Sequence, residues 1–388
     1  MLRYLSAGES HGPALTAIID GIPSGVTITA ESINRELKRR QTGYGRGGRM
    51  KIESDAVEIT SGVRFGKTLG SPITLVIRNR DWVNWQEKMA IESLVQGKPV
   101  NSVTQPRPGH ADLVGAIKFG HEDIRNVLER SSARETAARV AVGAIAKLVL
   151  AEFKVQIASQ VVSIGNIKCI LDISQWSIDK IARTTESTSL RCVSKEINRK
   201  MEKEIDLIKE QGDTVGGVFE IMTDGLPIGL GSYIQWDTRL DGKLAQAIMS
   251  IPAIKAVEIG AGFQAANLPG SQVHDAIYYK AGKFYRKTNN AGGLEGGITN
   301  GERLVIRAAM KPISTLLNPL PSVDIKTKQT TQATVERSDI CAVPAAAVVG
   351  EAMVAIELCK AIQEKFGGDS LEEIKRNYRL YLESFKKG

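Results

Sequence analysis

The sequence predicts an α+β fold in one large domain, with two buried helices forming a central layer covered by antiparallel sheets. The helical layer is predicted because residues 132–150 and 345–366 are apolar on nearly all sides through much of their length. A helix of that kind needs neighbours on more than one face. The sheets are predicted because most other apolar runs are short, rich in β-branched residues and bounded by Gly or Pro.

Both buried helices carry terminal signals. Ser132 and, three residues later, Glu135 form a capping-box pattern at the start of the first helix. Pro344 stands at the start of the second helix and Gly367 follows its end, which is the usual asymmetry of the two residue types. We therefore expect the first helix to begin at Ser132 and the second to run to about Phe366.

The remaining elements follow from shorter patterns. A helix from Thr29 to Arg40 is predicted by a capping Thr, an apolar pair one turn apart and three basic residues in the last turn. Two further helices are expected at 195–210 and 370–385, where charged and apolar residues alternate at helical spacing. Strands are expected at 15–20, 73–78, 155–164, 218–223 and 304–310.

The two halves of the chain resemble each other. Residues 20–23 (DGIP) recur as 224–227 (DGLP), and residues 129–131 (ERS) recur as 336–338 just before the second buried helix. The common order of these matches predicts an internal pseudo-twofold repeat with halves at roughly 1–195 and 205–388.

Composition restricts the class of protein. The 388 residues carry a formal net charge of +8, which favours anionic partners. No apolar run approaches the roughly 18 residues of a membrane span, and the N-terminus lacks a signal peptide pattern. The four cysteines show no C-x-x-C spacing, so we expect free thiols in the cytoplasm and no zinc site.

Short motifs of histidine, arginine, serine and glycine carry the functional signal. They are GESHG at 8–12, GYGRGGR at 43–49, RPGHAD at 107–112, RSSARE at 130–135 and RSD at 337–339. Glycine lets a ligand approach the backbone, arginine holds phosphate or carboxylate, and histidine moves protons near neutral pH. With His11 and His110 both in such motifs, the sequence predicts a site for a strongly anionic substrate that undergoes proton transfer.

Several familiar sites are excluded. Residues 43–48 match G-x-G-x-x-G, but a predicted helix rather than a strand precedes them, which argues against a dinucleotide fold. P-loop, metalloprotease and serine-hydrolase motifs are absent from the sequence, and the histidines lack metal-ligand spacing. Nucleic-acid binding stays an alternative because of the charge, although only 5% of the residues are aromatic and could stack on bases.

Five ordered motifs make the chain resemble the chorismate synthase family over essentially its whole length. They are the segments at 8–12, 43–49, 107–112, 129–136 and 336–339. Residues 290–293 (NAGG) resemble a sixth motif, with Asn290 where many members have histidine. The resemblance implies a sandwich of sheets around central helices, and the anti-1,4-elimination of phosphate from 5-enolpyruvylshikimate 3-phosphate to give chorismate.

The resemblance also implies roles for individual residues. His11 is expected to protonate the departing phosphate, and His110 to protonate or stabilise the reduced flavin. Asp339 is expected to help the flavin remove the ring proton, while Ser10 and Ser131 orient these groups. The substrate's two carboxylates and phosphate require cations in a dry site. The arginines expected to supply them are Arg40, Arg46, Arg49, Arg107 and Arg134, together with Arg337.

Members of this family require reduced FMN, although the reaction involves no net redox change. The resemblance implies FMN contacts at Arg130, Ser131, Ser132, Pro252, Ala253, Gly296, Lys311, Pro312, Ile313, Ser314, Thr315 and Arg337. It also implies a homotetramer, with loops around 40–50 and 85–110 that close over the ligands. Some members reduce the flavin with NADPH, and the sequence leaves open whether this one does. A conventional flavin oxidoreductase is the second alternative.

Overall fold

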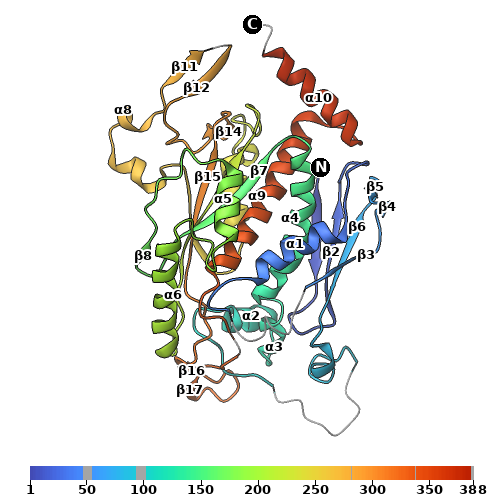
Figure 1. Ribbon diagram of the computed structural model, residues 1–388. Helices are drawn as coiled ribbons and strands as arrows, with labels where there is room; N and C mark the ends of the chain where they lie inside the picture. The colour runs from blue at the N-terminus through green and yellow to red at the C-terminus, as the bar shows by residue number, and fades with distance from the viewer. Residues whose placement is uncertain (47–54, 93–101, 281, 337, 386–388) are drawn as a thin grey trace.

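Two antiparallel sheets form the outer layers of the molecule. The computed structural model describes residues 1–46, 55–92, 102–280, 282–336 and 338–385 (Figure 1). The first sheet has the order β1 (Arg3–Ala7), β2 (Ala14–Asp20), β6 (Ile73–Arg78), β3 (Val57–Ile59). The second has the order β10 (Ile254–Ile259), β15 (Leu304–Met310), β9 (Gly217–Asp224), β7 (Gln156–Ile164), β8 (Ile167–Lys168). All neighbours within both sheets are antiparallel.

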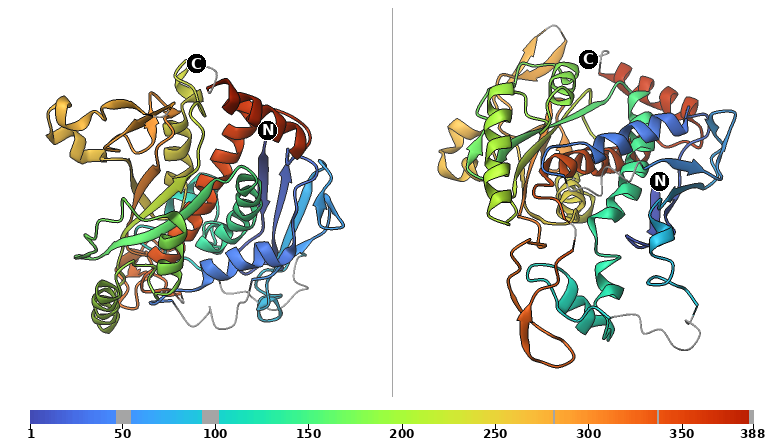
Figure 2. Two further views of the ribbon diagram at one scale, coloured as in Figure 1. Left: turned by 45° about the horizontal axis from the view of Figure 1, so that its top comes forward. Right: turned by 60° about the horizontal axis from the view of Figure 1, so that its bottom comes forward.

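Helices α4 (Thr136–Ala151) and α9 (Val343–Phe366) lie side by side between the sheets, as both views in Figure 2 show. Helix α4 contacts β2 and β6 of the first sheet, whereas α9 contacts β7 and β9 of the second. Because each helix touches a sheet on one side and the other helix on another, nearly all of its positions are buried. This explains why both sequences are apolar on nearly all sides.

The start of α4 differs from the prediction. Residues Ala133–Glu135 form a short 3-10 turn, and the α-helix begins only at Thr136. The Ser132 hydroxyl accepts a hydrogen bond from the Arg134 backbone N–H (3.3 Å), but the Glu135 carboxylate pairs with Arg139 instead of returning to Ser132. The predicted capping box is therefore wrong at this position, because a nearby guanidinium binds the glutamate.

The other helix predictions are close to the structure. Helix α1 (Ala30–Gln41) begins with a capping box between Thr29 and Ser32, and α9 has Pro344 in its first turn and ends before Gly367. Helices α6 (Lys195–Glu210) and α10 (Leu371–Ser384) cover the predicted ranges. The further elements include α5 (Ile178–Glu186), α7 (Leu240–Met249), α8 (Gly270–Val273), β4 (Val63–Arg64), β5 (Lys67–Thr68), β11 (Ile277–Lys280), β12 (Lys283–Arg286), β13 (Leu294–Glu295) and β14 (Ile298–Thr299).

A buried ion-pair network joins the central helices. The fully buried carboxylate of Glu351 on α9 accepts two hydrogen bonds from Arg39 of α1 (2.7 and 2.9 Å) and one from Lys147 of α4 (2.6 Å). Ser159 of β7 donates a further one (2.6 Å). Burial by itself would raise the pKa of Glu351, but attraction to Arg39 and Lys147 lowers it well below its usual range. The network fixes the last turn of α1, which carries Arg40.

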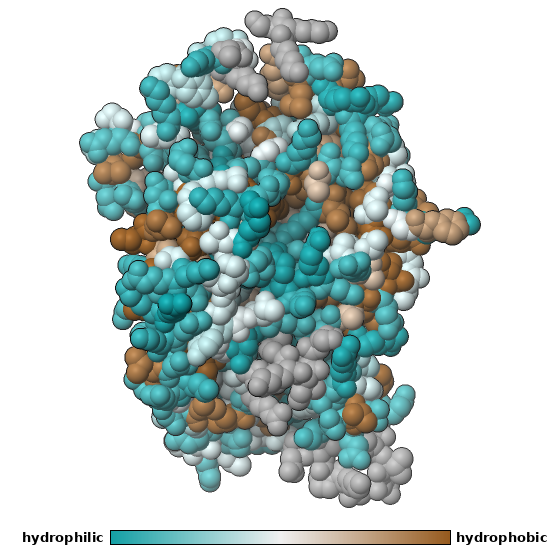
Figure 3. All heavy atoms as spheres, in the orientation of Figure 1, coloured by the Kyte–Doolittle hydropathy of each residue, from teal (hydrophilic) through white to brown (hydrophobic). Residues whose placement is uncertain are grey.

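Two smaller units project from the sheets. Helices α2 (Asp112–Phe119) and α3 (Arg125–Leu128) share a small apolar core and lie near the hairpin β16 (Pro321–Val323)–β17 (Thr330–Gln332), as the right view of Figure 2 shows. The hairpin β11–β12 and helix α8 project at the other end (Figure 1). The face drawn in Figure 3 is mostly hydrophilic, with hydrophobic residues in scattered groups. Among the described residues, no helix is long and apolar enough to cross a membrane.

Candidate active site

A cavity of about 970 Å³ lies where the N-terminal ends of α4 and α9 meet. Its other walls come from the β1–β2 loop, the loop after β6, the segment before α2, the α7–β10 turn and the segment after β15. The predicted site residues that line it are Ser10, His11, Arg40, Arg46, Arg107, His110, Ser131, Ser132, Arg134, Pro252, Ala253, Lys311, Ile313, Ser314, Thr315 and Asp339. The fold therefore brings both histidines and Asp339 to one cavity.

A few predicted residues lie elsewhere. Arg49 and Arg337 fall outside the described residues, as do residues 47–50 and 93–101 of the two loops expected to close. Pro312 stands between two residues of the cavity wall but does not line it. Gly296 lies in the turn between β13 and β14, where its neighbour is Tyr233. Within one chain, therefore, Gly296 is not part of the cavity wall.

His11 is held by a buried glutamate. Its Nδ1 lies 2.9 Å from both carboxylate oxygens of Glu129, and its backbone N–H donates to Glu129 Oε2 (2.8 Å). Arg125 donates a further hydrogen bond to Glu129 Oε1 (2.9 Å). Burial by itself would raise the pKa of Glu129, but the hydrogen bonds from His11 and the charges of His11 and Arg125 lower it. The ring of Trp85 stacks on His11 with centroids 3.6 Å apart.

His110 is held by a second buried carboxylate. Its Nδ1 lies 2.6 Å from Asp112 Oδ1 and 3.0 Å from Arg107 Nη2. Arginine can only donate and an ionised carboxylate can only accept, so Nδ1 cannot serve both partners. The shorter contact and the carboxylate's charge assign the proton of Nδ1 to Asp112. Burial would raise the pKa of Asp112, but hydrogen bonds from His110 and Arg107 lower it far below its usual range.

Lys311 contributes a positive charge beside His110. Its Nζ donates to Gly109 O and to Ser314 Oγ (both 3.0 Å), and the Ser314 hydroxyl donates to the same carbonyl (2.8 Å). Burial and the neighbouring charge of Lys255 lower the pKa of Lys311. A lysine with only neutral oxygen partners among the described residues is placed to bind an anion.

The arginines that line the cavity contact carboxylates or hydroxyl groups. Arg134 forms a short ion pair with the buried Asp55, and Arg40 Nη2 lies 4.0 Å from the same carboxylate. Arg46 Nη1 lies 3.1 Å from Asp339 Oδ2. Arg107 adds a hydrogen bond to Thr315 (2.9 Å) on the segment after β15. These contacts fix the guanidinium groups in place before any ligand binds.

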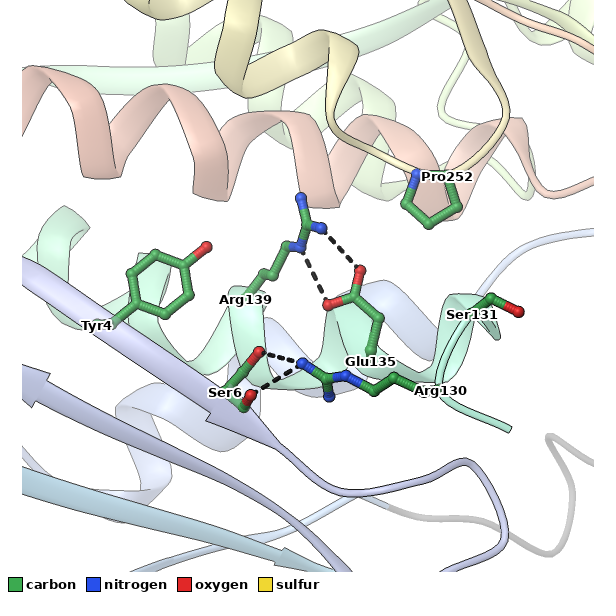
Figure 4. A pocket seen from close by; sticks show the side chains of 7 residues that line it. All are labelled: Tyr4, Ser6, Arg130, Ser131, Glu135, Arg139 and Pro252. Carbon is green, nitrogen blue, oxygen red and sulfur yellow. Dashed lines mark hydrogen bonds and ion pairs between the residues drawn. The ribbon is translucent and has the colours of Figure 1, made fainter. Parts of the chain in front are cut away.

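A smaller pocket of about 310 Å³ adjoins the large cavity, and Ser131 and Pro252 line both (Figure 4). Arg130 lines only this smaller pocket, where it donates to Ser6 O (2.8 Å) and Gly8 O (3.0 Å). Figure 4 shows the paired side chains of Glu135 and Arg139 on the same wall. The Ser131 hydroxyl donates to Val127 O (2.8 Å), which leaves its oxygen lone pairs for a ligand.

Sequence reasoning missed the residues that hold the two histidines. Asp112 and Glu129 stand inside the quoted motifs but received no role, although an acidic residue two positions from His110 was a usable signal. Nothing local points to Trp85 or Asp55, because Trp85 lines the cavity from the loop after β6 and Asp55 binds the lining residue Arg134 from the segment before β3. Among the described residues, no group of three or more potential ligands is placed to hold a metal ion.

Asn290, where the family resemblance led us to expect histidine, lies outside the cavity wall. Its side chain donates to Val273 O (2.9 Å), and its backbone N–H donates to Asp275 Oδ1 (2.9 Å). The Asn290 amide therefore fixes the connection between α8 and β12 and touches none of the residues described above.

Comparison with known proteins gives a consistent result. A family model described as chorismate synthase matches residues 2–363. A chorismate synthase from Geobacter sulfurreducens is 59% identical over 99% of both chains, and one from Desulforamulus reducens is 60% identical over 97% of both. A crystal structure of chorismate synthase matches with a TM-score of 0.81 and 46% identity, covering 100% of this chain and 99% of the other. By sequence, by fold and by the residues gathered at its cavity, the chain belongs to the chorismate synthase family.

Proposed function

We propose that the large cavity is where this chain converts 5-enolpyruvylshikimate 3-phosphate to chorismate. The chain is a lyase of the shikimate pathway by its family, and the elimination breaks a carbon–oxygen bond to phosphate and a carbon–hydrogen bond of the ring. One observation carries the assignment to this cavity. Two histidines, each bonded to a buried carboxylate, line the same cavity as four arginines and two lysines.

The charges of the cavity suit this substrate. Its two carboxylates and phosphate would lose their hydration on entering, so several fixed cations are needed. We assign this task to the lining arginines and Lys311. The arginines that line the cavity are Arg40, Arg46, Arg107 and Arg134, and we extend the assignment to Arg49 at the end of the glycine-rich motif.

The cavity also suits a second, flavin-sized ligand. Small-molecule sites usually measure roughly 300–1,000 Å³, and about 970 Å³ lies at the upper end of that range. Lys311, Ser314 and the adjoining Gly109, whose φ of +76° brings bare backbone to the wall, offer hydrogen bonds and space without a side chain. Reduced FMN held by these residues would supply electron density to the C–O bond that breaks, without net redox change.

The chain's own residues manage the protons. His11 holds a proton for the departing phosphate at Nε2, since Nδ1 is engaged by Glu129. Asp339, beside Arg46, assists removal of the ring proton. His110, with Nδ1 bonded to Asp112, presents Nε2 to the cofactor; Nε2 lies 3.5 Å from Arg107 Nη2. Ser10 and Ser131 orient the reacting groups from the β1–β2 loop and the start of α4.

We assign the FMN contacts to the walls shared by the two pockets. Ser131, Ser132, Pro252, Ala253 and the segment 311–315 lie on those walls. Arg130 has no carboxylate partner among the described residues, so it is suited to an anionic end of the cofactor in the smaller pocket. Arg337 belongs to the same proposal by its motif. Gly296 would reach a flavin only in another copy of this chain.

The test is an anaerobic reaction with photoreduced FMN and the enolpyruvyl substrate. We expect chorismate absorbance and free phosphate to rise together in equal amounts, without one NADPH consumed per turnover. A conventional flavin oxidoreductase would instead consume reductant stoichiometrically. Replacing the photoreduced FMN by oxidised FMN and NADPH tests whether this chain also reduces its own flavin.

We further propose a cytoplasmic homotetramer. Four unpaired cysteines fit a reducing compartment. Exposed apolar side chains such as Leu5, Ile18 and Ile117 fit subunit contacts. Light scattering during size-exclusion chromatography should give four times the chain mass of 42.0 kDa; a monomer mass would contradict this.

An internal pseudo-twofold repeat is the remaining proposal, and matching turns support it. Gly21 after β2 and Gly225 after β9 have φ of +80° and +84°, and in each a Cβ would meet the carbonyl that precedes the partner strand. Thr68 donates to Pro23 O and Thr299 to Pro227 O (both 2.6 Å). Superposing 1–78 on 154–310 should align β1, β2 and β6 with β7, β9 and β15; a mismatched strand order would remove the repeat.

A further inference from the structure

We propose that Glu129 and Trp85 are positioning residues that make His11 a proton donor only as the imidazolium and only through Nε2. This inference rests on the proposed function, in which His11 protonates the departing phosphate. Two contacts define it. Glu129 binds the edge of the His11 ring at Nδ1, and Trp85 covers a face of the same ring.

The contact with Glu129 fixes the tautomer. Both carboxylate oxygens lie 2.9 Å from Nδ1, and the backbone N–H of His11 binds the same carboxylate (2.8 Å). An ionised carboxylate is an acceptor only, so the hydrogen must reside on Nδ1. The neutral ring then has a bare Nε2, which can accept a proton but cannot donate one. His11 therefore donates to a ligand only when both nitrogens are protonated.

The surroundings keep Glu129 ionised. Its side chain is 1% exposed, and Arg125 donates to it from one turn earlier along α3 (2.9 Å). Arg125 also reaches Glu336 (3.3 Å), so the charge of Arg125 is shared between two acids. The remaining negative charge of Glu129 is directed at His11, which stabilises the imidazolium.

Trp85 supports the same state of the ring. The two rings are 3.6 Å apart at an interplanar angle of 20°, and an indole face attracts a cation. The indole N–H donates to Asp81 (2.9 Å), which fixes the Trp85 ring in its loop. Asn79 in the same loop donates to Gly12 O (2.9 Å), beside His11. The stack therefore joins two loops that are far apart in the sequence.

Other charged groups near the His11 ring come from each neighbouring element. The loop after β6 contributes Asp81 and also Lys88, whose ammonium lies 5.1 Å from the Trp85 ring centroid. Helix α3 contributes Arg125, 5.3 Å from the same centroid, and the segment before α9 contributes Glu336. Only Glu129 among them has a direct hydrogen bond to His11. Replacing Glu129 should accordingly change the titration of the His11 ring far more than replacing Glu336.

The first test titrates His11 by NMR in the full-length protein without ligands. The chain has 4 histidines, so ¹³C-labelled histidine gives few signals and a His11→Gln variant assigns the one of interest. In Glu129→Gln we expect the titration midpoint of His11 to move to lower pH, because the negative partner at Nδ1 is lost. The matched control Glu336→Gln should move it by less than a third of that. An unchanged midpoint in Glu129→Gln would overturn the inference.

The second test uses the fluorescence of Trp85 and does not depend on Glu129→Gln folding. A protonated imidazole quenches a stacked indole, so emission of the parent protein should rise as His11 loses its proton. Trp85→Phe and His11→Gln should each abolish this pH-dependent rise, while Trp176→Phe should retain it. A rise that persists in Trp85→Phe would contradict the stacking role.

Activity then separates this inference from the proposed function. In Glu129→Gln the alkaline limb of the kcat profile, where His11 loses its proton, should move to lower pH like the NMR midpoint, with KM changing less than about twofold. Suppose both spectroscopic results are obtained but His11→Gln still turns over normally. His11 would then be positioned as described without being the acid, and only the proposed function would fail.

Discussion

The surroundings of His11 and of His110 are built alike but assembled differently. In each, Nδ1 of a histidine meets a buried carboxylate that also binds an arginine: Glu129 with Arg125, and Asp112 with Arg107. The His110 group lies within residues 107–112, whereas the Glu129 carboxylate is 118 positions from His11. One group is local and the other exists only because distant loops meet.

The arginines also differ in what they touch. Arg107 Nη2 lies 3.0 Å from Nδ1 of His110, so a guanidinium group adjoins that ring directly. Arg125 contacts Glu129 and lies over Trp85, and among the described residues no guanidinium bonds to His11. The comparison teaches that the same pair of partners, a carboxylate and an arginine, can be supplied by one short motif or by loops far apart in the sequence.

The largest effect should come from removing either ring. His11→Ala and His110→Ala should each lower kcat by about 10²–10⁴-fold, measured with photoreduced FMN under anaerobic conditions. His121→Ala is the control, because His121 lies outside the cavity wall, beside Phe119. Near-parental turnover in His11→Ala or His110→Ala would remove that histidine from the chemistry and break the comparison.

Acid should destabilise both groups, and the sign follows from the carboxylates. The pKa values of Asp112 and Glu129 are lowered from their ordinary 3.8 and 4.5, so the unfolded chain binds more protons at low pH. Their contribution is fully present above pH 5 to 6 and is lost as pH falls through the folded-state values. Urea unfolding should therefore show stability that decreases steadily from about pH 5 downward.

The variant Asp112→Asn separates the contribution of Asp112 to acid sensitivity from that of Glu129. Breaking a buried pair costs about 3–5 kcal/mol, and Asp112 binds His110 and both the side chain and the backbone of Arg107. We expect lower stability at neutral pH and a shallower decrease in acid than in the parent protein. Parallel curves for parent and variant would show that Asp112 is not one of the groups responsible.

The smallest effect tests the local geometry of the His110 turn. Gly109→Ala and Gly120→Ala both place a side chain at positive φ (+76° and +68°), which costs about 1–2 kcal/mol. At Gly109 the new Cβ would also meet Ser314 Oγ and Lys311 Nζ at 3.4 and 3.5 Å, whereas nothing lies within 4 Å at Gly120. We expect the two variants to have similar melting temperatures, but only Gly109→Ala should have a lower kcat/KM. Equal kcat/KM values in the two variants would show that the turn does not position His110.

Part of the site could be predicted because its residues lie within short motifs that can be recognised in the sequence. The glycine, histidine and arginine motifs identified both histidines and three of the arginines of the cavity wall, and Asp112 was within reach of the same reasoning. The start of α4 could not be predicted, because Glu135 binds Arg139 rather than Ser132. Which of these two partners Glu135 binds depends on where the folded chain places Arg139.

The sequence by itself determined the helices whose caps and periodicity are local, as at Thr29, Pro344 and Gly367, and the residue types gathered at the cavity. Only the tertiary structure decided that Glu129 and Trp85 enclose His11, and that Glu351 joins Arg39 to Lys147. Caps and periodic faces are satisfied within a few residues of chain. A buried charge needs an opposite charge beside it, and its neighbours in space are set by the packing of the whole domain.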